Sequence, residues 1–305
     1  MNCSAIDLSE NKIIGKGQCS EVYEYDPDKV VKLFYGNIPE EEMLKEFNIT
    51  SECAAEGLAA VRFYEFVTFE GRKGILMQRV NGMSVEQAVL KNPEGLKEYA
   101  RKMALNLRDV HSKAVNNEKI PYSADFYKSC IEGCVKDKWI SEDEGKKLYE
   151  FLGAIPAKDT LIHGDYHVLN MLIENGEIVM IDLADVQKGN PVFDLLIANL
   201  YLHFMPLNMK ELYSCLIKIS PEESLNMWEV FLRTYFETED TARIERIKDV
   251  LDKYTMLKVI LSPYSFSNIP MDKAPGFVEM ARKIIMPCID DYIGRIPGDI
   301  LNIEK

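Results

Sequence analysis

The chain has 305 residues, which is long enough for two lobes with separate cores. Hydrophobic residues make up 47% and charged residues 28%, so the composition is that of an ordinary globular protein. The net charge of −13 argues against a broad nucleic-acid-binding surface, which needs clustered lysines and arginines.

The seven cysteines are scattered along the chain and none forms a C-x-x-C pair. This pattern predicts reduced thiols and a cytoplasmic location. The N-terminal residues lack an apolar signal segment, and the most apolar run, Leu195–Leu207, is too short to span a bilayer. We therefore expect neither a membrane nor a nucleic acid as partner, and nothing in the pattern indicates an oligomeric state.

The first third of the chain is predicted to be a small β-rich lobe with one helix. The helix begins near Pro39, where three glutamates complement the positive end of its dipole. The predicted strands are Lys12–Gly15, Glu21–Tyr25, Val30–Phe34, Arg62–Phe69 and Lys73–Gln78. The connector Arg79–Met83 then predicts a domain boundary, with an N-lobe at 1–81 and a C-lobe at 82–305.

The rest of the chain reads as mainly helical. Apolar residues recur at helical spacing over Glu98–Ala114, and residues 115–160 hold polar loops with at least two helices. Two short strands, Leu169–Glu174 and Glu177–Ile181, flank the turn dipeptide Asn175–Gly176. Everything after about Asp194 is helical in character, so the expected fold class is α+β.

Residues 15–20, GKGQCS, place two glycines between the first two strands. Such a hairpin can bring backbone N–H groups close to phosphates, although two glycines also commonly serve only a turn. Lys32 lies in the apolar strand VVKLF. It either points to solvent at a sheet edge or contacts phosphates while a carboxylate from the next helix holds it. Glu46 is the preferred partner and Glu42 the alternative.

The most informative stretch is LIHGDYHVLNMLIENGEIVMID, residues 161–182. Asp165 follows a predicted strand, Asn170 comes five residues later, and Asp182 follows the hairpin. A first Asp that orients a hydroxyl, with an Asn and a second Asp that hold Mg²⁺ on nucleotide phosphates, is a recurring solution to phosphoryl transfer. Asp185 either joins that metal site or is a loop residue.

These residues together resemble the aminoglycoside phosphotransferase and choline kinase family of the protein-kinase-like fold. HGD at 163–165 with Asn170 resembles the HGDxxxxN catalytic loop of that family. IDLAD at 181–185 resembles its ID-x-x-D segment, and PVFDL at 191–195 resembles its downstream P-x-x-D-L. The resemblance covers roughly residues 12–200.

The resemblance implies a two-lobed protein-kinase-like fold that binds ATP, or GTP, together with Mg²⁺. Asp194 would brace the catalytic loop, and His163 would orient that loop rather than act as the base. The remaining implied roles are Asp165 as catalytic base, Asn170 and Asp182 as metal ligands, Lys32 with Glu46 as the phosphate-orienting pair, Gly15, Gly17 and Ser20 in the loop over the phosphates, and Gln78 and Val80 in the hinge that meets the base.

Two departures from protein kinases favour a small-molecule acceptor. No D-F-G or A-P-E is present, and only eleven residues separate Asp182 from Asp194. The expected function is therefore phosphorylation of a hydroxyl on an aminoglycoside-like antibiotic, an amino alcohol or a sugar. The alternatives are a Ser/Thr protein kinase and a non-catalytic nucleotide-binding module, although such a module typically lacks one of the residues found here.

Acidic residues in the C-lobe bear on whether the acceptor is cationic. They either attract an amine-bearing substrate or form solvated helix faces, and the sequence leaves both interpretations open. These residues are Glu142, Asp143, Glu144, Glu237, Glu239 and Asp240.

Overall fold

The computed structural model describes residues 3–17, 19–55, 57, 61–266 and 272–293. By its internal contacts the chain divides into two compact units. We call Met1–Val85 with Val168–Asp185 the sheet unit, and Glu86–His167 with Val186–Lys305 the helical unit. The boundary near residue 82 stays a prediction.

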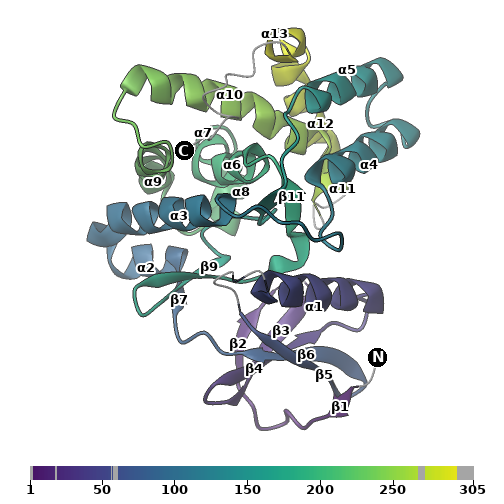
Figure 1. The fold of residues 1–305 in the computed structure, drawn as a ribbon, viewed down its shortest axis with the longest axis vertical. Coiled ribbons are helices and arrows are strands. Elements are labelled where there is room, and N and C mark those ends of the chain that lie inside the picture. Colours follow the sequence, from purple (N-terminus) through teal and green to yellow (C-terminus); the bar gives the residue numbers. More distant parts are fainter. Residues whose placement is uncertain (1–2, 18, 56, 58–60, 267–271, 294–305) are drawn as a thin grey trace. The chain divides into compact units, whose positions relative to one another are not determined.

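A six-stranded sheet forms most of the sheet unit, and its strands are antiparallel except for the β1–β5 pair. In spatial order they are β1 (Ser4–Ala5), β5 (Phe63–Phe69), β6 (Arg72–Gln78), β4 (Lys29–Phe34), β3 (Ser20–Asp26) and β2 (Ile13–Lys16). Figure 1 shows this sheet in purple and blue beside helix α1 (Glu40–Ala55). Phe34, Met43 and Ile75 are buried between sheet and helix, and Val31 and Leu33 are buried on the other face, as alternation along a strand requires.

The sheet unit also contains a smaller sheet in the order β10–β9–β7, followed by the short helix η2 (Leu183–Asp185). Its strands are β7 (Met83–Ser84), β9 (Met171–Glu174) and β10 (Glu177–Met180). Asn175 and Gly176 turn the β9–β10 hairpin with φ of 52° and 85°, which is the left-handed geometry that the Asn-Gly dipeptide predicts. The predicted hairpin is therefore confirmed, whereas β7 was not expected.

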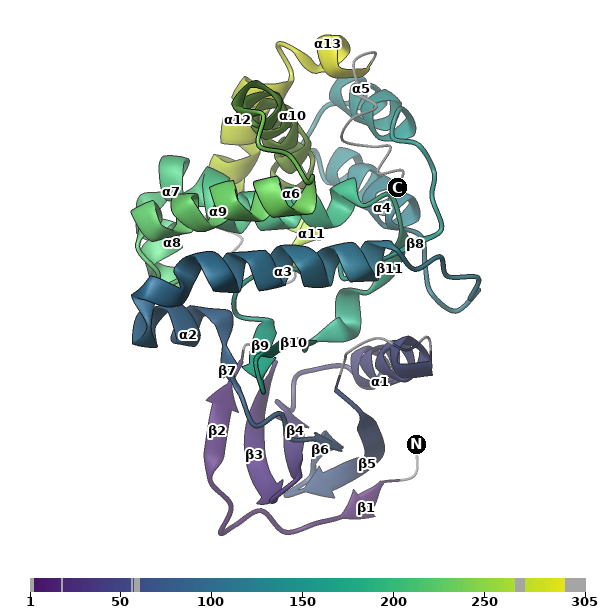
Figure 2. The same ribbon diagram turned by 60° about the vertical axis from the view of Figure 1, so that its left-hand side comes forward.

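Helices build nearly all of the helical unit, as predicted (Figures 1 and 2). α3 packs against α9, and α10 packs against both α6 and α12. Up to residue 199 the elements are α2 (Val85–Lys91), η1 (Pro93–Gly95), α3 (Leu96–His111), α4 (Ser123–Lys136), α5 (Glu142–Gly153), β8 (Thr160–Ile162), β11 (Gln187–Gly189) and α6 (Val192–Asn199). They continue with η3 (Leu200–Phe204), α7 (Met205–Asn208), α8 (Lys210–Leu216), α9 (Pro221–Tyr235), α10 (Thr241–Ile260), α11 (Ser262–Ser265), α12 (Ala274–Ile285) and α13 (Ile289–Ile293).

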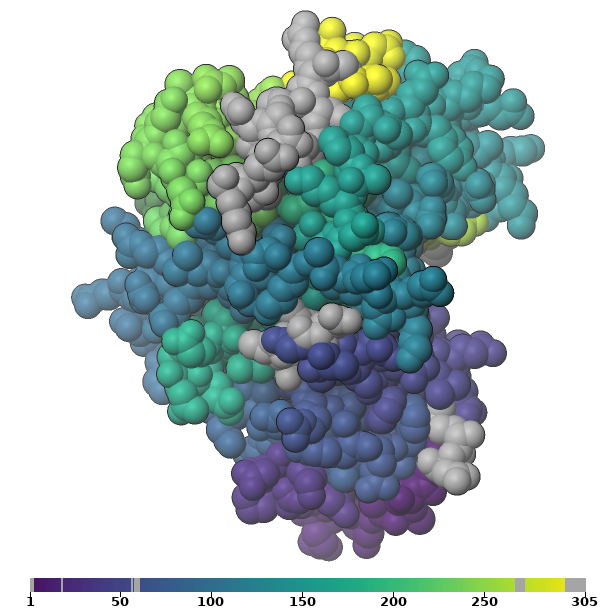
Figure 3. Space-filling view, viewed as in Figure 1, coloured from purple at the N-terminus to yellow at the C-terminus, as the bar shows by residue number. Residues whose placement is uncertain are grey.

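Local sequence signals explain where several of these helices begin. Ser141 with Glu144 forms a capping box at the start of α5, and Ser220 with Glu223 forms another at the start of α9. The teal side chains of α4 and α5 cover one edge of the helical unit in Figure 3. Over the described ranges, the helices include none with the length and apolar character needed to cross a bilayer.

The expected fold class is confirmed as α+β, with a β-sheet N-terminal region and a helical remainder. The seven cysteines are all free thiols, which agrees with the expectation of reduced cysteines.

Candidate active site

Lys32 lies in a charge cluster within the sheet unit. Its Nζ donates to Glu46 Oε1 at 2.6 Å and to Asp182 Oδ1 at 3.4 Å. Glu46 comes from the middle of α1, where its side chain is buried, and Asp182 follows β10. The contact goes to Glu46 and not to Glu42, which is exposed one turn earlier on α1.

Charge balance keeps the Lys32 ammonium protonated. Burial alone would lower the pKa of Lys32, but the carboxylates of Asp182 and Glu46 outweigh this effect and raise the pKa. A permanently charged lysine held on both sides by carboxylates has a fixed position. Such a group is suited to hold phosphate oxygens.

The β9–β10 hairpin brings Asn170 and Asp182 to the same end of a two-stranded ladder. Met171 pairs with Met180, and Ile181 N–H donates to the Asn170 carbonyl at 3.0 Å, so the two side chains stand just beyond the last strand pair. Asp182 has φ of 60°, a left-handed conformation that is uncommon for a residue with a side chain. We take this constrained backbone as a sign that the placement of the carboxylate matters.

The donor set at this hairpin end fits Mg²⁺ better than a transition metal. It offers one amide oxygen and one half-exposed carboxylate, and hard oxygen ligands of this kind suit Mg²⁺. Within the described residues no three His, Cys, Asp or Glu side chains gather into a metal-binding group. Mg²⁺ needs only one or two protein carboxylates, because phosphates and waters complete its shell.

The glycine-rich segment forms the tip of the β2–β3 hairpin. Gly15 pairs with Val22, and Gly17 N–H donates to the Ser20 carbonyl at 2.9 Å. Gln18, within the predicted loop, lies outside the described residues. At the far end of the sheet, Gln78 ends β6 and Val80 follows it, half-buried, in the connector that leads to β7.

In the helical unit, a buried carboxylate holds the loop that carries Asp165. Asp194 accepts from the backbone N–H of His163 at 2.8 Å and of Gly164 at 2.7 Å, and it contacts His111 Nε2 at 3.0 Å. A fully buried carboxylate needs such donors, and this one has three. The expectation that Asp194 braces the loop is therefore confirmed.

His163 serves the same loop from inside the helical unit. Its Nδ1 accepts from the Asp165 backbone N–H at 3.2 Å, and its side chain is buried against the Tyr166 ring. Because Nδ1 accepts, it carries no proton, and it cannot act as a proton donor at that atom. Gly164 takes φ of 82°, a conformation that glycine adopts without strain, and this bends the chain toward Asp165.

Asp165 itself lies among basic side chains. Burial alone would raise the pKa of Asp165, but the neighbouring His167, Lys258 and His163 outweigh it and hold the pKa well below its usual value. His167 Nε2 lies 3.2 Å from Asp165 Oδ2, and the Tyr201 ring lies 4.5 Å from the His167 ring. An ionised carboxylate that is one third exposed can accept a hydrogen bond from an arriving hydroxyl.

The two units therefore hold different parts of the predicted site. The sheet unit contains Lys32 and Glu46, which are in contact, the hairpin-end residues Asn170 and Asp182, and the glycine loop. The helical unit contains Asp165 and His163. Sequence reasoning missed Lys258, although a single lysine inside the apolar run TMLKVIL carries the same signal that drew attention to Lys32.

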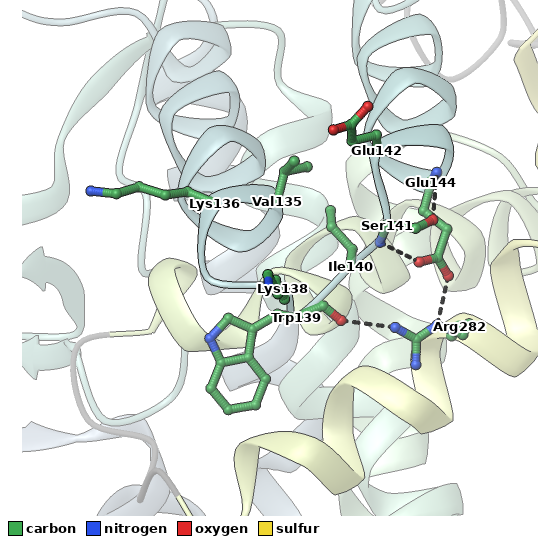
Figure 4. A pocket seen from close by; sticks show the side chains of 9 residues that line it. All are labelled: Val135, Lys136, Lys138, Trp139, Ile140, Ser141, Glu142, Glu144 and Arg282. Atoms are coloured by element: carbon green, nitrogen blue, oxygen red, sulfur yellow. Dashed lines mark hydrogen bonds and ion pairs between the residues drawn. The ribbon is translucent and has the colours of Figure 1, made fainter.

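The acidic residues considered as attractors of a cationic substrate mostly have partners of their own. Glu144 accepts from the Ser141 backbone N–H and from Arg282 at the rim of a hollow of about 650 Å³ between α4, α5 and α12 (Figure 4). The other four partnered residues pair as Asp143–Lys146, Glu237–Arg108, Glu239–Arg233 and Asp240 with the N-terminus of α10. These contacts favour a structural role for them.

Solved structures of known phosphotransferases share this fold. The streptomycin–ATP–APH(2'')-IIa ternary complex matches with a TM-score of 0.55 and 16% identity over 90% of this chain and 91% of that one. A choline/ethanolamine kinase family protein from Mesorhizobium loti matches with a TM-score of 0.56 and 13% identity over 93% and 91%. At these identities the similarity establishes the fold alone. It is the two-part α+β fold of protein-kinase-like phosphotransferases.

The sequence itself identifies the family. The model of the phosphotransferase enzyme family matches residues 11–208, well over half of the chain. This chain belongs to the phosphotransferase enzyme family, and it is a phosphotransferase with an alcohol group as acceptor. The resemblance predicted from the HGD and IDLAD motifs is thereby confirmed. The search of curated protein sequences gives no match.

Proposed function

We propose that this protein transfers the γ-phosphate of ATP, or GTP, to a hydroxyl of a small molecule in the cytoplasm. Sugars, amino alcohols and aminoglycoside-like antibiotics are the candidate acceptors. The observation that carries the proposal is the Asp165 loop, in which the Asp194 carboxylate accepts hydrogen bonds from two successive backbone N–H groups and the Asp165 side chain stays one third exposed. A fixed carboxylate of this kind positions an acceptor hydroxyl and takes its proton as transfer proceeds.

The sheet unit supports the nucleotide part of the proposal. Lys32, held by Glu46, would contact phosphate oxygens, and the N–H groups of the loop at Gly15, Gly17 and Ser20 would approach them. Gln78 and Val80 would meet the base. In support of nucleotide use, two solved structures of similar fold are described as complexes with ATP and with ADP.

Asn170 and Asp182 would hold Mg²⁺, which neutralises phosphate charge when it is bound. Asp185 lies in η2, 3.9 Å from Lys45, and we leave it outside the metal site. The short segment between Asp182 and Asp194 supports a small acceptor over a protein side chain. A nucleotide-binding module without activity is disfavoured because the lysine, the base and the metal ligands are all present.

The proposal is tested by ADP release from Mg-ATP with a panel of sugars, amino alcohols, aminoglycosides and a generic protein substrate. We expect turnover on a small molecule, and a decrease on the order of 10²–10⁴-fold in Asp165→Ala, because a positioned acid–base group contributes about that factor. Asp143→Ala is the matched control, since Asp143 is 90% exposed on α5. Unchanged turnover in Asp165→Ala would refute the proposed base, and phosphorylation of the protein substrate alone would favour a protein kinase.

A further inference from the structure

Lys258 is a buried cation without an oxygen partner among the described residues. In the described part of the chain, Lys188 and Lys258 are the lysines less than a tenth exposed, at 6% and 8%. Lys188 Nζ donates to the Asn117 carbonyl at 3.1 Å. Lys258 Nζ, in contrast, makes no hydrogen bond or ion pair with any described residue. A buried ammonium without such a partner is costly, so its position calls for a ligand.

Two aromatic rings lie beside this ammonium. Lys258 Nζ lies 4.9 Å from the centre of the Phe266 ring and 5.9 Å from that of Phe126. Phe126 belongs to α4, and Phe266 directly follows α11, the helix that contacts α4. Rings stabilise a cation modestly but do not neutralise it. Lys258 keeps 8% of its surface exposed, and its Nζ is not among the fully enclosed unpaired polar atoms of the described residues.

The ammonium is close enough to Asp165 to act on it electrostatically. Its charge is one of those that lower the pKa of Asp165, yet the two groups do not form an ion pair. Asp165 already has His167 at 3.2 Å. Carboxylate and ammonium therefore influence each other within the helical unit, and the ammonium makes no hydrogen bond or ion pair with any described residue.

We infer that Lys258 receives an anionic group of the acceptor, a carboxylate or a phosphate, while the acceptor hydroxyl lies at Asp165. This inference rests on the proposed function and names its substrate class: a hydroxy compound that carries negative charge. In the transfer, the acceptor oxygen bonds to the γ-phosphorus, the bond to the β–γ bridging oxygen breaks, and the hydroxyl proton passes to Asp165. A polycationic acceptor would bring a like charge to Lys258 in a poorly solvated place, which is unfavourable.

The test compares matched acceptors that differ in charge. Hydroxy acids such as glycerate and gluconate are paired with glycerol and glucose, glucose 6-phosphate is paired with glucose, and choline serves as a cation. ADP release from Mg-ATP gives kcat and KM for the wild type, Lys258→Met and Lys258→Arg. Lys253→Met is the matched control, because Lys253 lies on the same helix near Tyr292 and ion-pairs with Asp249.

We expect the wild type to prefer an anionic compound over its neutral partner by roughly 100-fold in kcat/KM, the size of one desolvated charge contact. Lys258→Met should lose this preference through a raised KM, Lys258→Arg should restore most of it, and Lys253→Met should behave as wild type. Comparing kcat/KM for hydroxy acids with that for the sugar phosphate shows whether a carboxylate or a phosphate is the recognised group. In parallel, the melting temperature is measured with each compound.

Several outcomes would overturn the inference. One is best turnover on a neutral or cationic compound, which leaves the proposed function intact. Another is an equal decrease of kcat on both members of a pair in Lys258→Met, which would make Lys258 only a positioning residue for Asp165. If no compound is phosphorylated, the melting temperatures decide: anions that stabilise the wild type but not Lys258→Met support the site, and equal shifts refute it. Loss of the proposed function appears separately, as the absence of Asp165-dependent transfer to any hydroxyl.

Discussion

The two lysine–carboxylate groups of this protein are built in opposite ways. In the sheet unit, Lys32 Nζ forms ion pairs with Glu46 at 2.6 Å and with Asp182 at 3.4 Å. In the helical unit, Asp165 and Lys258 influence each other without pairing, and rings surround the ammonium. In the first group two carboxylates hold one ammonium in place, which suits a phosphate-orienting lysine. The second keeps its charges apart, which suits a site whose ligand supplies the missing partners.

The largest expected effect concerns Asp182, which contacts Lys32 and also belongs to the proposed metal site. We expect Asp182→Ala to lower the affinity for Mg-ATP by roughly 100-fold and to remove its dependence on Mg²⁺, because a ligand and a charge partner of Lys32 are lost together. Calorimetric titration of ATP with and without Mg²⁺ measures both effects.

Asp26→Ala is the control for that experiment. Asp26 is a carboxylate of the same unit that pairs with Lys29 at a turn, remote in sequence from the hairpin end. The Asp26→Ala variant should bind Mg-ATP as the wild type does. If Asp182→Ala kept a normal Mg²⁺ dependence, the assignment of Asp182 as a metal ligand would be wrong. Holding Lys32 would then be the only role left for the Asp182 carboxylate.

A smaller effect is expected at Gly74, whose lack of a side chain lets β6 approach β4. An added Cβ would lie 2.8 Å from the Lys32 carbonyl oxygen, and the backbone has little freedom to move away. Gly74→Ala should lower the free energy of unfolding by about 1–3 kcal/mol, the usual cost of overpacking. It should also weaken nucleotide binding, because Lys32 shifts with its strand.

Gly36→Ala separates this effect from the general cost of replacing glycine. Gly36 follows β4, and a Cβ there would meet nothing within 4 Å. Urea unfolding should place Gly36→Ala within about 0.5 kcal/mol of the wild type. Equal stability of the two variants would show that β4 can relax, and the position of Lys32 would then be less rigid than its contacts indicate.

Much of the fold was predictable because the signals are local. The Asn175–Gly176 turn, the acidic start of α1 and the apolar alternation in β4 each follow from a few neighbouring residues. The short strands β1, β7 and β11 were missed, since two or three residues carry no periodic pattern. The apolar run Leu195–Leu207 gives no local sign of the π-helical turn η3, which interrupts it at Leu200–Phe204.

The candidate site was less evenly predictable. Lys32 and Glu46 could be paired in advance because a strand lysine and a helix carboxylate follow each other along the chain. His111 could not be assigned to Asp194, because their contact joins residues far apart in sequence and depends on how α3 and α6 pack. Lys258 had a sequence signal, but its ring partners come from other helices, so its lack of an oxygen partner is visible only in three dimensions.

The smallest expected effect is a change in folding stability at extreme pH. It distinguishes Asp165 from Lys32, because the two side chains lose their contributions at opposite ends of the pH range. The pKa of Asp165 is below its unfolded value of about 3.9, so its contribution to stability is complete above that pH and is lost as the pH falls through the folded pKa. The pKa of Lys32 is above its unfolded value of about 10.4, so its contribution is complete below that pH and is lost as the pH rises through the folded pKa.

Urea unfolding in metal-free buffer, from about pH 3 to 11, measures both contributions. Each is the difference in the free energy of unfolding between the wild type and a variant that lacks the charge. The gap between wild type and Asp165→Asn should shrink as the pH falls below about 4, where the folded Asp165 carboxylate begins to take up a proton. The gap between wild type and Lys32→Met should be constant over the neutral range and shrink above about pH 10.4. If the Asp165 gap did not shrink below about pH 4, the pKa of Asp165 would not be lowered in the folded state, and its neighbours would not hold it as an ionised acceptor of the substrate hydroxyl.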